Sequence, residues 1–138
     1  MNRLTLSYRY DDTDDFGRLG VELCTDNFCG QGGFWVQWQD VKEFGETLSA
    51  YPIPPDAHLS ASWGYNMQEG DDLIVSIQIA PENATGDLRV RVELADESEQ
   101  SERVRASFVT NYPELEAFRL GIAALMDRKC DEATLAGR

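Results

Sequence analysis

Apolar and polar side chains alternate along seven separate segments of the chain. In one of them, apolar residues occupy positions 88, 90, 92 and 94, and charged residues lie between them. A period of two residues is typical of a half-buried β-strand. The segments are 4–10, 19–24, 34–38, 59–63, 73–79, 88–94 and 104–108. Polar links at 66–72, 81–87 and 95–101 predict hairpins, so the chain favours an antiparallel sheet.

Two further stretches have helical periodicity. Asp40 is a suitable N-cap, and Val41, Phe44 and Leu48 follow at helical spacing until the proline-rich stretch 52–55 ends the helix. Near the C-terminus, Asn111 and Glu114 form a capping box. The apolar stripe of this second predicted helix consists of Leu115, Phe118, Ile122, Leu125 and Met126.

These elements predict an α+β fold. We expect a single antiparallel meander of about seven strands, with two helices packed on one face and a polar opposite face. The 138 residues fit one domain spanning 1–138, with a polar C-terminal tail that frays from about residue 129. The alternative is a small closed barrel with one helix plugging it.

The charge balance limits the kind of partner. The chain has 25 acidic and 12 basic side chains, a formal net charge of −13. Such a surface repels nucleic acid and anionic membranes and favours basic partners. No apolar run approaches the roughly 20 residues of a membrane helix, and the N-terminus lacks the apolar stretch of a signal peptide. We therefore expect a cytoplasmic protein that binds neither nucleic acid nor membrane.

The cysteines fit that compartment. Cys24 and Cys29 face each other if Asp26-Asn27 forms a two-residue turn, close enough for a disulfide. In a reducing cytoplasm, two small semi-buried thiols are the favoured interpretation. Three scattered cysteines and the remote His58 do not supply the about four close ligands of a zinc site. No cofactor or metal is expected.

Two loops bear a superficial likeness to ligand-binding motifs. The acidic turn 11–15 departs from a calcium loop, because Phe16 occupies a ligand position and Leu23 stands where the closing glutamate belongs. The glycines at 30–33 lack the following Lys-Ser or Lys-Thr of a phosphate loop, and a β-bulge is the favoured interpretation. No motif sets a nucleophile beside His58, so we expect no enzymatic activity.

Two groups of side chains are candidates for binding. Trp35 is out of phase with Phe34 and Val36, which places it on the open sheet face as an interface candidate. Four arginines share one side of two adjacent predicted strands, with Val92 paired to Val104: Arg89, Arg91, Arg103 and Arg105. This pairing sets Glu93 opposite Arg103 and Arg91 opposite Arg105. A salt-bridged outer surface is the favoured interpretation, and the alternative is a site for an anionic ligand.

One layout covers most of the chain. It consists of Gly33-Phe34-Trp35-Val36, a helix opened by Asp40 with Phe44 and Leu48, the strand 88–94, and a closing helix with Leu115 and Phe118. This layout resembles that of small uncharacterised bacterial α+β proteins, some of which are described as immunity proteins encoded beside secreted toxins. The resemblance implies cytoplasmic binding of a toxin domain and no catalysis.

The function expected from the sequence is therefore non-enzymatic binding of a basic protein, such as a nuclease toxin domain. The acidic segments 11–15, 69–72 and 96–102 would steer the partner, with Trp35 as an anchor. The candidate binding residues are Trp35, Arg89, Arg91, Arg103, Arg105, Asp11, Asp12, Asp14 and Asp15. One alternative is a small-molecule binding protein or enzyme that uses the arginine-lined face for an anionic ligand. Another is a homodimer formed through the open sheet face.

Overall fold

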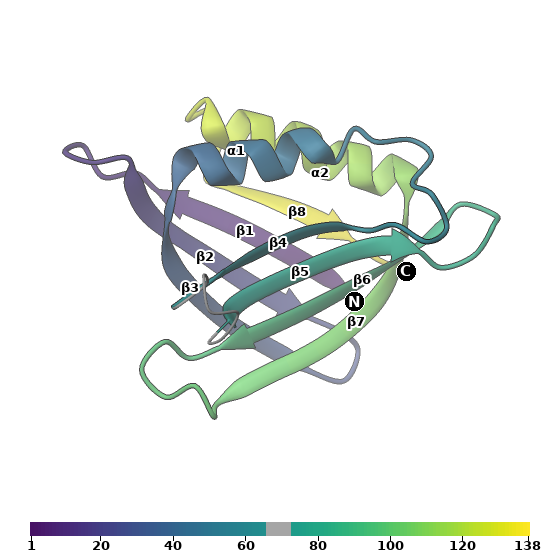
Figure 1. The fold of residues 1–138 in the computed structure, drawn as a ribbon, viewed down its shortest axis with the longest axis horizontal. Coiled ribbons are helices and arrows are strands. Elements are labelled where there is room, and N and C mark those ends of the chain that lie inside the picture. Colours follow the sequence, from purple (N-terminus) through teal and green to yellow (C-terminus); the bar gives the residue numbers. More distant parts are fainter. Residues whose placement is uncertain (66–72) are drawn as a thin grey trace.

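The computed structural model describes residues 1–65 and 73–138, over which the chain forms eight strands and two helices (Figure 1). In chain order the elements are β1 (Arg3–Arg9), β2 (Phe16–Cys24), β3 (Cys29–Gln37), α1 (Trp38–Thr47), β4 (Leu59–Gly64), β5 (Leu73–Pro81), β6 (Asp87–Ala95), β7 (Arg103–Asn111), α2 (Tyr112–Met126) and β8 (Glu132–Ala136). Neither of these helices has the length and apolar character needed to cross a membrane.

The strands form two antiparallel sheets of four strands each. Sheet A has the order β3-β2-β1-β8, and sheet B has the order β4-β5-β6-β7. The α+β class is confirmed, but the single seven-strand meander is wrong. The meander breaks where α1 separates β3 from β4, and α2 then returns the chain from β7 to the free side of β1 (Figure 1).

The C-terminal segment is a strand, so the predicted fraying from residue 129 is wrong. Leu135 lies opposite Leu4, and Ala133 lies opposite Leu6, in the register of β8 against β1. The side chains of Ala133 and Leu135 are both buried. The last residues also tie the two sheets together, because the Arg138 amide donates to the carbonyl of Val109 in β7 at 3.0 Å. Burial of two apolar side chains holds a segment that looks polar in the sequence.

The core lies between the inward faces of the two sheets and beneath the helices. Its largest fully buried side chains come from both sheets and from α2, among them Leu6, Leu19, Ile77 and Phe118. The helices lie side by side across one side of the molecule (Figure 1). The outward faces of sheets A and B are left free of helices, and they carry the polar positions of the alternating strands.

The helix starts follow local chemistry in different ways. The Asn111 side chain accepts a hydrogen bond from the Glu114 amide at 2.9 Å, which confirms the predicted cap of α2. The first helix begins earlier than Asp40, because Gln37 is its N-cap and makes no side-chain cap bond. Instead, the Trp38 amide donates to the carbonyl of Asp15 at 3.1 Å. This bond fixes the start of α1 against the β1–β2 hairpin.

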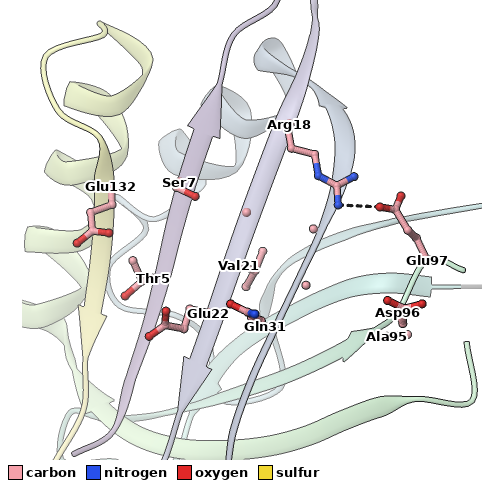
Figure 2. Close-up of a pocket in the computed structure, with 13 residues that line it drawn as sticks. Thr5, Ser7, Arg18, Val21, Glu22, Gln31, Ala95, Asp96, Glu97 and Glu132 are labelled. Atoms are coloured by element: carbon pink, nitrogen blue, oxygen red, sulfur yellow. Dashed lines mark ion pairs between the residues drawn. The ribbon is translucent and has the colours of Figure 1, made fainter. Parts of the chain in front are cut away.

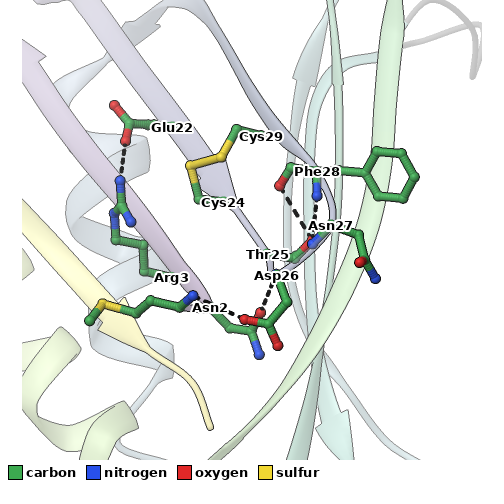
Figure 3. Close-up of a disulfide and its surroundings, with 10 residues drawn as sticks. Asn2, Arg3, Glu22, Cys24, Thr25, Asp26, Asn27, Phe28 and Cys29 are labelled. Carbon is green, nitrogen blue, oxygen red and sulfur yellow. Dashed lines mark hydrogen bonds and ion pairs between the residues drawn. A yellow bond between two sulfur atoms is a disulfide. The ribbon is translucent and has the colours of Figure 1, made fainter.

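The β2–β3 hairpin carries a disulfide. The Thr25 amide donates to the carbonyl of Phe28 at 2.7 Å, which leaves Asp26 and Asn27 as a two-residue turn. Cys24 and Cys29 are therefore opposite each other, and a disulfide joins them (Figure 3). The favoured interpretation of two separate thiols is wrong. Disulfides persist mainly in oxidising compartments, so this bond does not favour the cytoplasmic placement, which stays a prediction.

The glycines of β3 serve close packing. The strand pairs with β2 from Cys29 to Gln37 without a shift of register, so the predicted bulge is wrong. A Cβ atom on Gly30 would lie 2.5 Å from Cγ1 of Val104 in β7. Only a residue without a side chain lets the two sheets approach this closely at that point.

Candidate functional site

The outward face of sheet A is a patterned polar surface. Across the strands, Ser7 lies opposite Gly20 and Gly20 opposite Gly33, so the middle of the face has almost no side chains. The next row places Thr5 opposite Glu22. Because glycines occupy the centre, longer side chains around them form the rim of a depression.

This depression is a groove of about 360 Å³ (Figure 2). Hydroxyl and amide groups of Thr5, Ser7 and Gln31 line it. Four carboxylates also line it, from Glu22, Asp96, Glu97 and Glu132. Arg18 is the one cationic side chain among the lining residues. The groove is therefore polar and negatively charged.

Arg18 links this face to the loop between β6 and β7. Its guanidinium Nη2 lies 2.7 Å from Oε1 of Glu97, and each side chain is 29% exposed (Figure 2). A Cβ atom on Gly33 would lie 3.3 Å from the same Nη2 and 2.5 Å from the Leu19 carbonyl oxygen. Because Gly33 has no side chain, the Arg18 side chain has room to cross β3 at this position.

Two exposed aromatic side chains lie on the same face. Trp35 is 53% exposed and Phe16 is 43% exposed. Phe16 lies opposite Gln37, and Arg18 lies opposite Trp35, so the two aromatic residues occupy diagonal positions on neighbouring strands. Diagonal neighbours on one face are within reach of aromatic side chains. The Arg18 guanidinium carbon lies 6.0 Å from the centre of the Trp35 ring.

The acidic turn lies directly beside these aromatic residues, since Asp15 precedes Phe16. Oδ1 of Asp11 accepts hydrogen bonds from the amide and hydroxyl of Thr13, at 2.9 and 2.8 Å, and these bonds lower the pKa of Asp11. Oδ2 of Asp15 accepts from Gln39 at 3.0 Å. Hydrogen bonds therefore hold the carboxylates of Asp11 and Asp15 in place. Over residues 1–65 and 73–138, no three metal-ligating side chains are grouped closely enough to hold an ion.

The predicted arginines occupy the outward face of sheet B, away from the groove. The predicted register of β6 and β7 is wrong by two residues, because Leu94 lies opposite Val104 and Glu93 opposite Arg105. A shift of two residues keeps every side chain on the same face. Arg89, Arg91, Arg103 and Arg105 therefore still share one face, as their parity predicts.

Ion pairs engage most of these arginines. Arg89 binds Glu82 through two nitrogens, at 2.7 and 3.1 Å. Arg103 contacts Glu93 at 2.7 Å and Arg105 contacts it at 3.5 Å. The hydrogen bond from Arg103, together with the nearby charge of Arg105, lowers the pKa of Glu93. Arg91 forms no ion pair with any residue that the structure describes.

The remaining candidates are dispersed. The acidic segment 69–72 lies outside the described residues. In the segment 96–102, Oδ2 of Asp96 accepts from the amides of Ser98 and Glu99 and so shapes its own loop. His58 is exposed in the link between α1 and β4.

Sequence reasoning missed Phe16, and it placed Glu97 in the acidic segment 96–102 without its contact with Arg18. The alternation of β2 continues backwards from Glu22 through Arg18 to Phe16, and following it to the strand end identifies this residue. Glu97 reaches the face from a distant loop, for which the sequence has no signal. Comparison with known proteins finds no family model that matches this chain and no curated protein of similar sequence.

Proposed function

We propose that the protein binds a basic protein partner without catalysing a reaction. The binding surface is the Phe16–Trp35 surface, defined as these two aromatic residues with two acidic loops beside them. One loop contributes Asp11, Asp12, Asp14 and Asp15, and the other contributes Asp96 and Glu97. The observation that carries the proposal is this placement of exposed aromatic residues between carboxylates on the helix-free face of sheet A.

The arrangement has the chemistry of a protein interface. Tryptophan is enriched among the residues that contribute most to binding energy, surrounded by contacts that exclude water. The flat rings also attract lysine and arginine side chains of a partner through their π-faces. Carboxylates around them would steer a basic partner and raise its association rate at low salt.

The net charge of −13 extends this preference to the whole molecule. A basic nuclease domain of a secreted toxin is the kind of partner that such a surface fits, and its nucleic-acid groove would be blocked by the bound carboxylates. The resemblance in layout to immunity proteins supports this choice. His58, exposed and without a hydrogen bond to any described residue, supports binding rather than catalysis.

The test is affinity capture from the source organism, followed by titration with the purified partner. Wild-type protein is used as bait at about 50 mM and about 500 mM salt, because electrostatic steering weakens as the Debye length falls. A Trp35→Ala, Phe16→Ala double variant is compared with Tyr51→Ala. Tyr51 is 76% exposed but lies outside this surface, so it is the matched control.

We expect an identified basic protein that binds wild type and the control within twofold and binds the double variant at least tenfold more weakly. Recovery of no basic protein at either salt concentration contradicts the proposal. Equal affinity of the double variant and the control would show that the partner binds at a surface other than the Phe16–Trp35 surface. Self-association that the double variant abolishes assigns the surface to a second copy of the chain instead.

A further inference from the structure

Arg91 stands on the outward face of sheet B among hydrogen-bond donors. Its neighbours in register are Gln78 on β5 and Ser107 on β7. The guanidinium is exposed and makes no ion pair within the described part of the chain. An unpaired arginine flanked by an amide and a hydroxyl is a starting point for anion binding.

Arg105 supplies a second, loosely held guanidinium. Its side chain is 78% exposed, and its contact with Glu93 is long, at 3.5 Å. Glu93 is already engaged by Arg103 at 2.7 Å. Arg105 lies opposite Glu93 and is therefore diagonal to Arg91, at a Cβ separation of about 7 Å for such pairs. One ligand with several oxygens can reach both.

The two arginines line the same depression, of about 430 Å³. Its other polar lining residues are Ser76, Gln78, Glu93 and Ser107. Among the described residues of this face, the four guanidinium groups meet the carboxylates of Glu82 and Glu93, while Asp87 at the start of β6 is paired with Arg138. These described residues therefore have a surplus of two positive charges within an acidic protein.

We propose that this depression binds the phosphate groups of a small phosphorylated molecule. Arg91 and Arg105 hold the oxyanion, with Ser76, Ser107 and Gln78 as neutral donors. Phosphate is favoured over a single carboxylate because the donors come from three strands, and one guanidinium alone engages both oxygens of a carboxylate. The volume lies within the roughly 300–1,000 Å³ of small-molecule sites. The site is independent of the Phe16–Trp35 surface, which lies on the other sheet.

The negative charge elsewhere does not prevent binding at this face. At about 0.1 M ionic strength the Debye length is about 10 Å, so distant carboxylates are screened. The adjacent arginines act within that distance. The arginines therefore attract the ligand only at short range, and we expect no long-range steering of the ligand.

The test is a titration of ¹⁵N-labelled protein with sodium pyrophosphate, followed by amide chemical shifts. Sodium chloride and sodium succinate at the same ionic strength are the comparison ligands. The variants are Arg91→Gln and, as a second substitution at the site, Arg105→Gln. Arg119→Gln is the control, because it removes one arginine charge from α2, where Arg119 pairs with Glu116. Circular dichroism checks that each variant is folded.

We expect saturable shifts centred on Gln78, Arg91 and Ser107 with pyrophosphate, and affinity at least tenfold lower in Arg91→Gln. Arg105→Gln should weaken binding at least threefold, and Arg119→Gln should stay within twofold of wild type. Equal shifts with chloride, or unchanged affinity in Arg91→Gln, overturn the site. Tighter binding of succinate than of pyrophosphate overturns the assignment to phosphate.

Discussion

Arg18 passes across β3 above Gly33 and pairs with Glu97 at 2.7 Å. This contact connects β2 of sheet A with the β6–β7 loop of sheet B, and the guanidinium crosses β3 where Gly33 has no side chain. The same arginine lies beside Trp35, so the pair also helps to fix the proposed binding surface. Gly33, the Arg18–Glu97 ion pair and the Trp35 ring are therefore structurally linked.

Gly33→Ala should destabilise the protein by about 1–3 kcal/mol, the usual cost of inserting atoms where there is no room. The new Cβ would lie 2.5 Å from the Leu19 carbonyl oxygen, which is backbone and cannot rotate away. Gly32→Ala is the control in the same strand, since its Cβ would meet Leu94 at 3.6 Å, an ordinary contact. Urea unfolding of both variants measures the difference. Equal stabilities of the two variants contradict the packing described for position 33.

Leu135→Ala should cost about 2–5 kcal/mol, as expected for a fully buried leucine. The side chain is 0% exposed and lies opposite Leu4. Thr134→Ala, on the exposed side of β8, should change the free energy of unfolding by less than about 1 kcal/mol. The measurement is denaturant unfolding followed by tryptophan fluorescence. A frayed tail would give no difference between the variants.

Glu93→Gln should lower stability at neutral pH by about 0.5–1 kcal/mol, because the carboxylate pairs with Arg103 and Arg105 near the surface. These partners lower the pKa of Glu93 below its usual 4.5. The stabilisation is therefore complete above about pH 5 and is lost as the pH falls through the lowered pKa. Unfolding of wild type and variant between pH 7 and pH 3 should show their difference shrinking. Glu43→Gln, at an exposed helix position, is the control for the loss of one carboxylate. A difference that is constant with pH contradicts the ion-pair origin.

Reduction of the Cys24–Cys29 disulfide should lower stability by about 2 kcal/mol, from the entropy of closing a loop with a sequence separation of 5. Thermal unfolding with and without dithiothreitol measures this effect. The double variant Cys24→Ser, Cys29→Ser should be insensitive to reductant, whereas Cys130→Ser should respond as wild type does. Cys130 is a free thiol. A mass that does not rise by the two hydrogen atoms that reduction adds would show that the bond is absent.

Alternation predicts the strands well because it is a local property. All seven expected segments overlap strands, although Tyr10 lies beyond the end of β1 and Trp38, expected in a strand, is the first residue of α1. The cap at Asn111 is where the sequence places it. The amino-terminal half of β3 escapes prediction because glycines at 30, 32 and 33 have no side chains with which to alternate. The strand β8 escapes because five residues show too few periods beside polar neighbours.

Pairing between strands is harder to predict than the strands themselves. Parity assigns Arg91 and Arg105 to the outward face. A shift of two residues preserves parity, so parity alone cannot determine the register of β6 against β7. The division into two sheets depends on contacts between distant segments, such as β8 with β1. The exposure of Trp35 follows from its parity, whereas the contact between Arg18 and Glu97 depends on the fold.

The placement of β8 beside β1 has a consequence for synthesis on the ribosome. The strand β1 leaves the ribosome first, and its outer edge stays uncovered until β8, the last described strand, has been made. Until β8 has been made, the backbone donors and acceptors along that edge of β1 lack their native partners. A nascent chain of this fold is therefore exposed to wrong edge-to-edge pairing until translation of the described elements is complete.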